Sequence, residues 1–459
     1  MRDFGLDDTI IAVSTPPGEG GIGILRLSGG NALDVARRIF RAKKKSGRMT
    51  AQLAVFGNLF DFESGEALDD AYLLYFPGPH SYTRENVVEI SCHGSPAVLE
   101  EGLKLGVRAG ARLARPGEFT LRAYLHGRID IIQAEGVNDL IRAGSAKSAK
   151  MAFRLLEGRL SRKIEWLREQ IIEVLSDIEA LIEFPDEPLP LDKMNVGAAL
   201  GQLIDFVERL VSGYDVGKAL SDGVSLGIVG RANVGKSTLF NAILEDERAI
   251  VTPYPGTTRD YLKERIQIKD AHFNLVDMAG IGRPSSKIER ESMRRGRKIA
   301  AEADGRLLVL DTSKKEDPED IALLGEFQRK KSLLVFNKID LPRKMDVARV
   351  KERFPRLTAT EISALKGTYL EDLRENIYKV FAPQLADRED VIFHLRQKVL
   401  FDEMLVNLKN GLALLLGGHS EEVFAEEIRK IIPIIGQLTG EIRTEEVIDN
   451  IFGRFCIGK

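Results

Sequence analysis

One phosphate-binding signature does most to constrain the fold of this chain. Residues 230–237 read GRANVGKS and fit the pattern G-x-x-x-x-G-K-[ST]. An apolar run at 224–229 precedes them and a plausible helix begins at Thr238, which is the strand–loop–helix context of a phosphate-binding loop. Glycines let backbone N–H groups approach the phosphates, Lys236 supplies positive charge, and the Ser237 hydroxyl can bind Mg²⁺. The segment therefore predicts a P-loop nucleotide-binding domain.

Two further motifs indicate that the nucleotide is GTP. A strand-like run ends in DMAG at 277–280, where Asp277 would support the magnesium shell and Gly280 the γ-phosphate. A second strand-like run ends in NKID at 337–340, which places Asp340 to accept both guanine N–H donors. A pocket that pairs with those donors rejects adenine, because mispaired buried polar groups are costly.

Composition restricts the class of protein and its location in the cell. A chain of 459 residues can hold about three domains. Its net charge of −3 gives no global attraction to nucleic acid, so any RNA contact must be local. Two distant cysteines, Cys92 and Cys456, do not make a disulfide framework and fit a reducing cytosol. The first residues lack the apolar core of a signal peptide, and no apolar run is long enough to span a bilayer, so a cytoplasmic location is predicted.

The pattern of apolar residues and glycines changes three times along the sequence. Residues 1–120 combine glycines with short apolar runs, which predicts an α+β domain. Residues 121–217 and 382–459 have helical periodicity, and the nucleotide-binding segment 218–381 lies between them. We therefore predict an α/β domain inserted into one discontinuous helical domain.

Two long amphipathic helices are predicted, one on each side of the inserted domain. Apolar residues at steps of three and four form a stripe on each. The first stripe consists of Leu160, Ile164, Leu167, Ile171, Leu175, Ile178 and Ile182. The second consists of Leu395, Val399, Met404, Leu405, Leu408, Leu412 and Leu415.

Other features leave the chemistry open. Residues 18–23 match G-x-G-x-x-G, but a strand-like run follows instead of a helix, so a tight loop that borders another ligand site is favoured over a dinucleotide fold. Ile281 occupies the place where Ras-like proteins have a water-orienting glutamine. No arginine finger can be assigned, so hydrolysis must take both functions from elsewhere. The basic segment 287–298 is either a solvated helix face or a contact face for RNA or a partner.

Motifs along the whole chain resemble the MnmE, or TrmE, family of tRNA-modification GTPases. The matching segments are TPPG at 15–18, GILR at 23–26, FPGP at 76–79, RPGEF at 115–119, FPD at 184–186, PGTTRD at 255–260 and FCIGK at 455–459. One departure is Met278, where the family usually has threonine.

The resemblance implies a multidomain fold. Its parts would be an α+β, folate-binding-like N-terminal domain that mediates homodimerisation, an all-α helical domain, and an inserted Ras-like α/β P-loop GTPase domain. A 5-formyl- or methylene-tetrahydrofolate site carries over to Arg26, Glu89, Arg128 and Lys459, and Cys456 belongs to a tail related to the modification.

The resemblance also assigns the nucleotide and metal residues. Glu289 would orient the attacking water, Ser237 and Thr258 would bind Mg²⁺, and K⁺ would be held beside the phosphates. The potassium ligands would be Asn233, Thr252, Tyr254 and Thr257. The full GTP-binding set would be Asn233, Val234, Gly235, Lys236, Ser237, Thr238, Thr252, Pro253, Tyr254, Pro255, Gly256, Thr257, Thr258, Asp277, Met278, Ala279, Gly280, Asn337, Lys338, Asp340, Ser363, Ala364 and Leu365.

As implied by the family, the chain would act on tRNA with MnmG, a partner that binds FAD. Together they would add an aminomethyl or carboxymethylaminomethyl group to carbon 5 of the wobble uridine, position 34, of certain tRNAs. Folate would supply the one-carbon unit, and G-domain dimerisation in potassium would activate hydrolysis. The alternative is a ribosome-assembly or RNA-binding GTPase switch. It is disfavoured because the region after 384 has no G-x-x-G and no second phosphate-binding signature exists.

Overall fold

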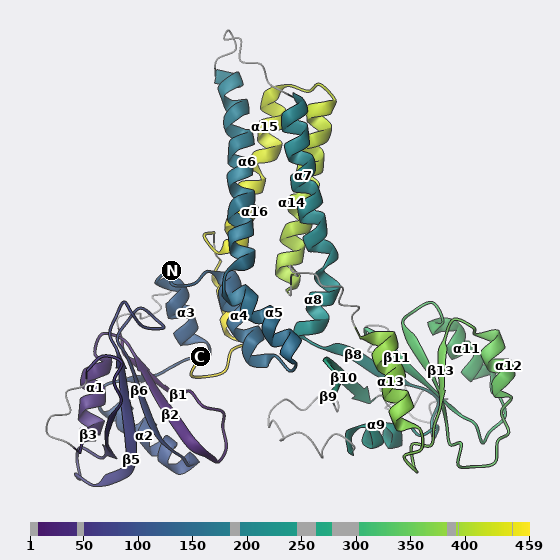
Figure 1. Cartoon of the computed structure of the whole chain (residues 1–459), viewed down its shortest axis with the longest axis horizontal. Coiled ribbons are helices and arrows are strands. Elements are labelled where there is room, and N and C mark those ends of the chain that lie inside the picture. Colours follow the sequence, from purple (N-terminus) through teal and green to yellow (C-terminus); the bar gives the residue numbers. More distant parts are fainter. Residues whose placement is uncertain are drawn as a thin grey trace, which may run out of the picture. The chain divides into compact units, whose positions relative to one another are not determined.

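The computed structural model describes residues 8–43, 50–183, 193–245, 263–277, 303–382, 392, 394–442 and 444–459. The described chain forms two compact units. The first contains Met1–Ile141, Ala152–Ile204 and Glu403–Lys459, and the second contains Arg142–Met151 and Asp205–Asp402. Most of the second unit lies between two stretches of the first, so the nucleotide-binding region is an insertion (Figure 1).

A seven-stranded sheet organises the N-terminal part of the first unit. Its strand order is β3-β4-β5-β6-β2-β1-β7. The strands are β1 (Ile10–Val13), β2 (Gly20–Ser28), β3 (Phe40–Ala42), β4 (Val55–Phe60), β5 (Ala67–Phe76), β6 (Val87–Gly94) and β7 (Arg112–Leu113), and the helices α1 (Ala32–Ile39) and α2 (Pro96–Arg108) share one core with them. Leu25 and Leu27 of β2 are buried in that core, so Arg26 between them lies on the opposite face of the sheet.

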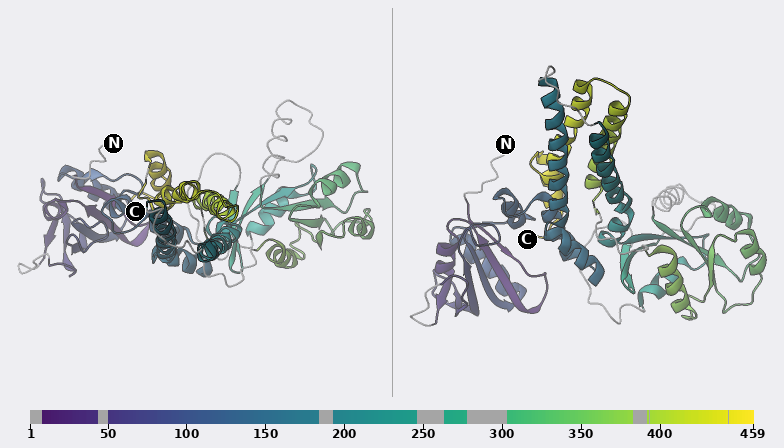
Figure 2. Two further views of the ribbon diagram at one scale, coloured as in Figure 1. Left: turned by 90° about the horizontal axis from the view of Figure 1, so that it is seen from above. Right: turned by 45° about the horizontal axis from the view of Figure 1, so that its top comes forward.

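Helices from both sides of the insertion pack together in the first unit. The helices that lie wholly or partly in this unit are α3 (Glu118–Leu125), α4 (Ile131–Arg142), α5 (Ala146–Leu156), α6 (Arg159–Glu183), α7 (Lys193–Ser212), α14 (Leu395–Leu416), α15 (Glu421–Arg429), α16 (Ile431–Thr439) and α17 (Glu445–Phe452). Figure 2 shows α6 as one continuous helix, and α15 and α16 pack against it. An ion pair of 2.7 Å between Arg429 and Glu179 joins α15 to α6. Helices from before and after the inserted segment therefore contact each other in this unit.

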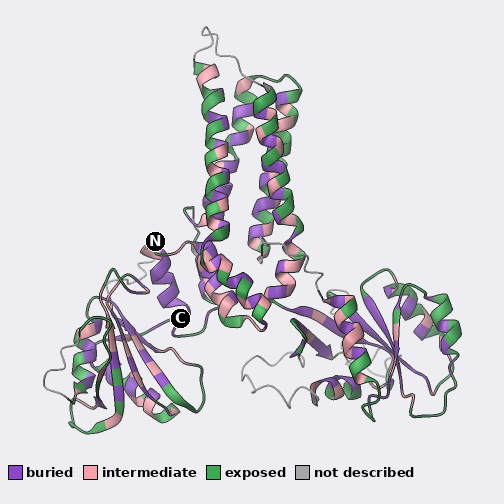
Figure 3. Ribbon diagram, in the orientation of Figure 1, coloured by how far each residue is buried: buried purple, intermediate pink, exposed green. Residues whose placement is uncertain are grey.

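Buried and exposed residues alternate around these helices as an apolar stripe requires (Figure 3). On α6 the predicted stripe is buried from Leu160 to Ile178. On α14 the prediction was wrong in the first two turns, because Leu395 and Val399 are 62% and 53% exposed. Leu400 and Phe401 are buried there instead, and spacing alone does not define which face of a helix meets its neighbours.

The second unit contains a six-stranded sheet with the order β13-β12-β11-β8-β10-β9. Its elements are α8 (Tyr214–Ser221), β8 (Val224–Val229), α9 (Lys236–Glu245), β9 (Lys263–Ile268), β10 (Ala271–Asp277), β11 (Gly305–Asp311), α11 (Pro318–Phe327), β12 (Ser332–Asn337), α12 (Val347–Arg353), β13 (Thr358–Glu361) and α13 (Leu370–Phe381). All neighbours are parallel except β9, which is antiparallel to β10. One core joins α9 and α13 to one face of the sheet, and another joins α11 and α12 to the other face. This is the predicted inserted α/β domain with the P-loop.

Candidate functional site

The phosphate-binding loop joins β8 to α9 in a conformation that needs two of its glycines. Gly235 has φ +99°, and a Cβ there would lie 2.4 Å from Asn337 Nδ2. A Cβ on Gly230 would lie 2.5 Å from the carbonyl oxygen of Val309 in β11. Any other residue at these positions would push the loop away from β11 and from Asn337.

Lys236 places its ammonium group over the loop. It is 7% exposed, and its Nζ donates to the carbonyl oxygens of Gly230 at 3.1 Å and Arg231 at 2.8 Å. Ser237 and Thr238 follow in the first turn of α9 and are exposed. A cation over the loop and a hydroxyl at the helix N-terminus are the groups that phosphates and a divalent cation require.

Asn337 joins three of the predicted motifs. It ends β12, is 2% exposed, and donates from Nδ2 to the Val234 carbonyl oxygen at 2.9 Å. Its Oδ1 accepts a hydrogen bond from the Ala364 amide at 3.0 Å. The loops that follow β8, β12 and β13 meet here because the carboxyl ends of parallel strands share one edge of the sheet. The structure thus brings Val234, Asn337 and Ala364 together.

Lys338 is held between the phosphate loop and a buried carboxylate. Its Nζ donates to the Asn233 carbonyl oxygen at 2.6 Å and pairs with Asp311 Oδ2 at 2.7 Å. Asp311 ends β11, is 3% exposed, and accepts from the Ser313 hydroxyl at 2.6 Å. Burial alone would raise the pKa of Asp311, but hydrogen bonds from Lys338 and Ser313 outweigh it and lower that pKa. Asp311 is therefore ionised at neutral pH and holds Lys338 in place.

Replacing Asp311 by asparagine should weaken the binding of both GTP and GDP. A hydrogen bond to a charged group contributes about 1.5–3 kcal/mol, which corresponds to roughly 10- to 150-fold in affinity if Lys338 no longer holds the loop. Titration with a fluorescent guanine nucleotide measures the change. Ser313→Ala removes a neutral donor to the same carboxylate and is the matched control, with a smaller loss expected. Equal affinities of Asp311→Asn and the wild type would contradict the anchoring role.

Asp340 lies at the same edge and is oriented by Ser363. The Ser363 hydroxyl is fully buried, donates to Asp340 Oδ1 at 2.6 Å, and accepts from the Lys366 amide at 3.2 Å. A carboxylate has about four acceptor positions, so Asp340 can still receive two N–H donors. Leu365 follows in the same loop and is 73% exposed, which leaves an apolar side chain available to a planar base.

Several predicted residues lie wholly or partly outside the described part of the chain. Asp277 ends β10, and its backbone pairs with Ile228 of β8, but its side chain lies outside the description. Ile281 and the basic segment 287–298 also lie outside the described residues. The remaining site residues outside them are Thr252, Pro253, Tyr254, Pro255, Gly256, Thr257, Thr258, Met278, Ala279, Gly280 and Glu289.

A second cluster of predicted residues lies in the first unit, where the C-terminus meets the N-terminal sheet. Arg26 of β2 is directly opposite Glu89 of β6, and its Nε donates to Glu89 Oε1 at 2.8 Å. Arg26 Nη1 also donates to the Gly458 carbonyl oxygen at 3.1 Å. Burial, and next the charge of Arg26, lower the pKa of the Lys459 ammonium, while Glu89 opposes the change. Arg26, Glu89 and Lys459 are therefore neighbours.

Arg128 is oriented toward the same cluster through Tyr82. Its Nη1 donates to the Ser81 carbonyl oxygen, and its guanidinium lies 5.1 Å from the centre of the Tyr82 ring. Burial raises the pKa of Tyr82, and the charges of Arg26 and Arg128 both oppose that rise, so both cations act on this ring. The cluster offers two guanidinium groups, a carboxylate and an aromatic ring, which suits a planar ligand with acidic and polar edges.

The C-terminal segment is docked on α3 through Phe452 and Phe455. Both phenylalanines are buried, and Phe452 lies 6.0 Å from the ring of Tyr124 in α3. Gly458 has φ +94°, and a Cβ there would lie 2.1 Å from a backbone oxygen of β1, so only glycine allows this approach. Cys456 is an exposed free cysteine within this docked segment.

An ion-pair network holds α3 in place beside the cluster of Arg26, Glu89 and Lys459. Arg122 is fully buried and pairs with Asp8 at 2.6 Å, Glu85 at 3.1 Å and Glu118 at 3.1 Å. Phe119 on the same helix lies under the Arg26 guanidinium, 5.7 Å from its central carbon. A buried cation with several carboxylate partners is costly to disturb, so α3 is held firmly against the sheet.

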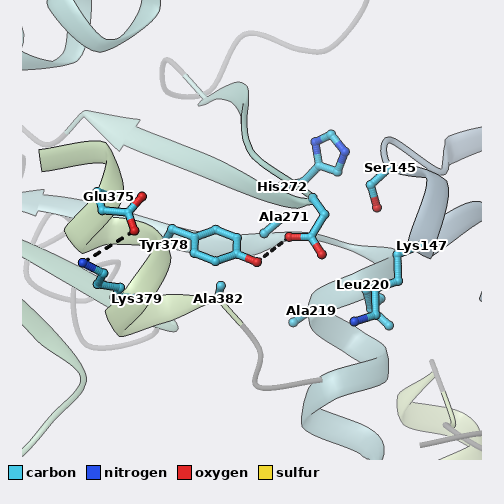
Figure 4. A pocket seen from close by; sticks show the side chains of 11 residues that line it. Ser145, Lys147, Ala219, Leu220, Ala271, His272, Glu375, Tyr378, Lys379 and Ala382 are labelled. Carbon is cyan, nitrogen blue, oxygen red and sulfur yellow. Dashed lines mark hydrogen bonds and ion pairs between the residues drawn. The ribbon is translucent and has the colours of Figure 1, made fainter. Parts of the chain in front are cut away.

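The second unit also contains a pocket of about 300 Å³ that none of the predicted site residues lines (Figure 4). Parts of α5, α8, β10 and α13 surround it. The Tyr378 hydroxyl donates to Asp270 across it at 2.5 Å. His272 is buried, which lowers its pKa, and packs so closely on Gly144 that a Cβ there would lie 2.3 Å from its Nε2. The pocket therefore marks where residues 142–151 rest on the inserted domain.

Among the described residues, no helix combines the length and apolar character needed to cross a membrane. Within the same residues, no group of three or more histidine, cysteine, aspartate or glutamate side chains is arranged to hold a metal ion.

Comparison with known proteins identifies the family. Residues 131–456 match the MnmE helical domain, and residues 9–128 match the N-terminus of the GTP-binding protein TrmE. The chain is 41% identical to a tRNA modification GTPase MnmE from Aquifex aeolicus over 98% of this chain and 100% of that protein. The chain belongs to the MnmE family of tRNA-modification GTPases. A second MnmE, from Natranaerobius thermophilus, is 39% identical over 99% of this chain and 100% of its own length.

Among solved structures, the matches cover less of the chain. Aquifex aeolicus Era bound to GDP and AlF₄⁻ is 28% identical over 40% of this chain and 67% of Era, with a TM-score of 0.29. The G domain of the T. maritima FeoB iron transporter is 27% identical over 34% of this chain and 98% of that domain, with a TM-score of 0.27. The assignment to the MnmE family, and with it GTPase activity, rests on the full-length relatives.

Sequence reasoning missed two charged residues of the nucleotide site. Asp311 could have been found, because it is a charged residue at the carboxyl end of a buried strand-like run. Arg231 lies within the phosphate loop itself, and its side chain pairs with Asp317 at 2.7 Å and Glu319 at 3.2 Å. These partners follow it by more than 80 residues, so spacing gave no signal for the pairing.

Proposed function

We propose that this chain hydrolyses GTP while it modifies carbon 5 of the wobble uridine, position 34, of certain tRNAs. MnmG, a partner that binds FAD, takes part, and the product carries an aminomethyl or carboxymethylaminomethyl group. Membership of the MnmE family over the full length supports the substrate class. The observation that carries the proposal is the docking of the C-terminal residues beside Arg26 and Glu89. This docking places a tail with a free cysteine next to a cluster of side chains suited to binding a ligand.

Mass spectrometry of tRNA nucleosides tests this function directly. A strain without this gene should lose the modified wobble uridine, and the intact gene should restore it. Restoration by a gene that encodes Lys236→Ala would contradict a requirement for GTP. Wild-type levels of the modified nucleoside in the deletion strain would contradict the function itself. A cytoplasmic location is part of the proposal, since the substrate is tRNA.

Magnesium and potassium are part of the proposed nucleotide site. Ser237, exposed at the start of α9, fits a magnesium ligand, and Thr258 is the proposed second ligand. Asn233 is exposed at φ +64°, and its amide oxygen fits a potassium ligand together with Thr252, Tyr254 and Thr257. Potassium would supply positive charge beside the phosphates. A homodimer, in which two G domains meet, completes the proposal.

A folate that carries a one-carbon unit is the proposed ligand of the N-terminal cluster. The glutamate tail of a folate suits Arg26, Arg128 and Lys459, and its pterin ring suits Glu89 and an aromatic neighbour such as Tyr82. The described residues from 394 onward form helices without strands, which supports this function over an RNA-binding switch with a KH module.

Arg26→Ala should lower affinity for formyl-tetrahydrofolate by roughly 10- to 100-fold, the scale of one lost charge-assisted hydrogen bond. Calorimetry on the full-length protein measures it, and GTP turnover should change little. Arg41 is the matched control, because it is exposed on the same sheet and stacks on Phe60 at 4.2 Å. Unchanged folate affinity in Arg26→Ala would remove Arg26 from the site.

Deletion of residues 456–459 should abolish tRNA modification and leave the fold intact. Phe452 and Phe455, which pack against α3, remain in the shortened chain, so the melting temperature should change little. Nucleoside mass spectrometry after complementation gives the result. A shortened protein that still modifies tRNA would exclude a role for Cys456 and the residues after it.

A further inference from the structure

A group of basic side chains lies at the amino edge of the sheet in the second unit. We call it the basic edge patch. Its members are Arg329, Lys330, Lys331, Arg353 and Arg356. The first three precede β12, Arg353 ends α12, and Arg356 precedes β13. Because β12 and β13 are parallel neighbours with Leu333 opposite Thr358, the segments that lead into them lie side by side.

All five members of the patch are exposed. In the part of the chain that the structure describes, none of them forms an ion pair with a carboxylate. The nearby Lys351 and Arg343 differ, because both pair with Glu361. Two of the patch residues rest on aromatic rings of the fold: Lys330 lies 5.5 Å from the Phe327 ring centre and Arg353 lies 5.8 Å from that of Phe354. Residues 326–331 and 351–356 contain two carboxylates, Glu326 and Glu352, so the patch keeps a positive charge.

The chemistry of the patch fits phosphate groups better than a protein surface. Protein interfaces need apolar or aromatic anchors at their centre. Among the described residues 326–358, the exposed large hydrophobic residue is Leu341, which lies in the loop after β12, at the opposite edge of the sheet. Phe327 and Phe354 are buried under the cations. A cluster of arginine and lysine without apolar anchors is typical of contacts to a nucleic-acid backbone.

We propose that the basic edge patch binds the phosphate backbone of the tRNA substrate. This inference rests on the proposed function for the choice of RNA. The phosphate loop, Lys338 and Asp340 lie at the carboxyl edge of the sheet, so nucleotide and tRNA can be bound at the same time. Backbone contacts carry no sequence information, so the patch positions tRNA without selecting among tRNAs.

Binding of an unmodified tRNA transcript to the full-length, GDP-bound protein tests the patch. K330E/K331E and R353E/R356E should each weaken binding at least about tenfold in fluorescence anisotropy. They should also reduce the slope of log affinity against log salt concentration by about 1–2 in magnitude. Each lost phosphate contact lowers the magnitude of this slope by roughly 0.7–0.9. K314E/K315E is the matched control, because both lysines are exposed on the same domain, outside the patch, and the change in charge is equal. It should change affinity less than about threefold.

GTP turnover and thermal unfolding of each variant show whether the domain is intact. If K330Q/K331Q also weakens binding in proportion to the charge removed, the effect is electrostatic and supports the proposal. Affinity and salt dependence equal to the wild type in both patch variants would overturn it. So would loss of binding to a partner protein with tRNA binding unchanged, which would assign the patch to an acidic protein. A wild-type protein that binds no tRNA and restores no modified uridine would instead refute the proposed function.

Discussion

Replacing Asp340 by asparagine should lower the affinity for GTP by about 10²- to 10⁴-fold and make xanthosine triphosphate the preferred nucleotide. The Asp340 carboxylate would accept two N–H donors of guanine, and each charge-assisted hydrogen bond contributes about 1.5–3 kcal/mol. An asparagine presents an N–H₂ group to one of those guanine donors. That donor and the N–H₂ group then face each other, and neither has an acceptor. Xanthine has a carbonyl oxygen in place of the guanine amino group, so it can accept from that N–H₂.

The position of Asp340 makes this reversal specific. Ser363 donates to Oδ1 at 2.6 Å, and Asn337 ties the same loop to the phosphate-binding loop, so the side chain has a fixed orientation. Competition between the two nucleotides, measured with a fluorescent analogue, gives the preference. Ser363→Ala is the control: it removes an orienting hydrogen bond and should weaken both nucleotides by a similar, smaller factor. A variant Asp340→Asn that still prefers GTP would show that this motif does not read the base.

The sequence predicted several of the motifs that lie together at the carboxyl edge of the second sheet, because these motifs are short and stand at the ends of strands. Asn337 ends a buried parallel strand and Lys338 follows it, and the topology of an open α/β sheet brings such strand ends to one edge. The Asp311–Lys338 pair was not predicted, although Asp311 ends β11 and Lys338 follows β12, because no fixed motif marks the carboxylate. The pairing of Arg231 with Asp317 depends on how the N-terminus of α11 packs beside the loop, which periodicity does not encode.

The N-terminal cluster could be predicted only from the resemblance. Arg26 and Glu89 are 63 residues apart and face each other because of the register between β2 and β6. Lys459 reaches them because the residue directly before it, Gly458, allows close approach to β1. Neither the register nor the docking of a terminus follows from local spacing. The exposure of Leu395 and Val399 on α14 has the same origin: a stripe predicts that one face is buried but not which neighbour covers each turn.

Hydrolysis of GTP should be strongly faster in potassium than in sodium at the same ionic strength. Ile281 has no group that can orient water, and the arginine of the phosphate loop is not free to neutralise the γ-phosphate. Arg231 is held by Asp317, directly before α11, and by Glu319 on α11. The charge must therefore come from elsewhere, and an arginine finger in related chemistry contributes ~10³–10⁵-fold, which is the upper limit of the expected effect.

The ligand set on the phosphate loop favours a large alkali ion. The Asn233 carbonyl oxygen is occupied by Lys338 at 2.6 Å, while the exposed Asn233 amide side chain remains for a cation. A neutral amide oxygen with hydroxyl and carbonyl oxygens from the 252–257 segment suits potassium, and the smaller sodium ion would leave such a cage underfilled. Asn233→Ala should therefore remove most of the potassium stimulation and leave GDP affinity nearly unchanged. Equal rates in sodium and potassium would refute the cation site.

Glu289→Ala separates the water-orienting group from the cation. It should lower kcat by about 10²–10⁴-fold, the usual contribution of a positioned general base, and leave GTP affinity and potassium-dependent association of G domains unchanged. Single-turnover hydrolysis gives kcat, and light scattering with a transition-state analogue gives the association. Asn233→Ala should show the opposite pattern, because association depends on the ion. If Glu289→Ala hydrolyses GTP at the wild-type rate, another residue orients the water; if it loses association as well, Glu289 acts on the dimer and not on the attacking water.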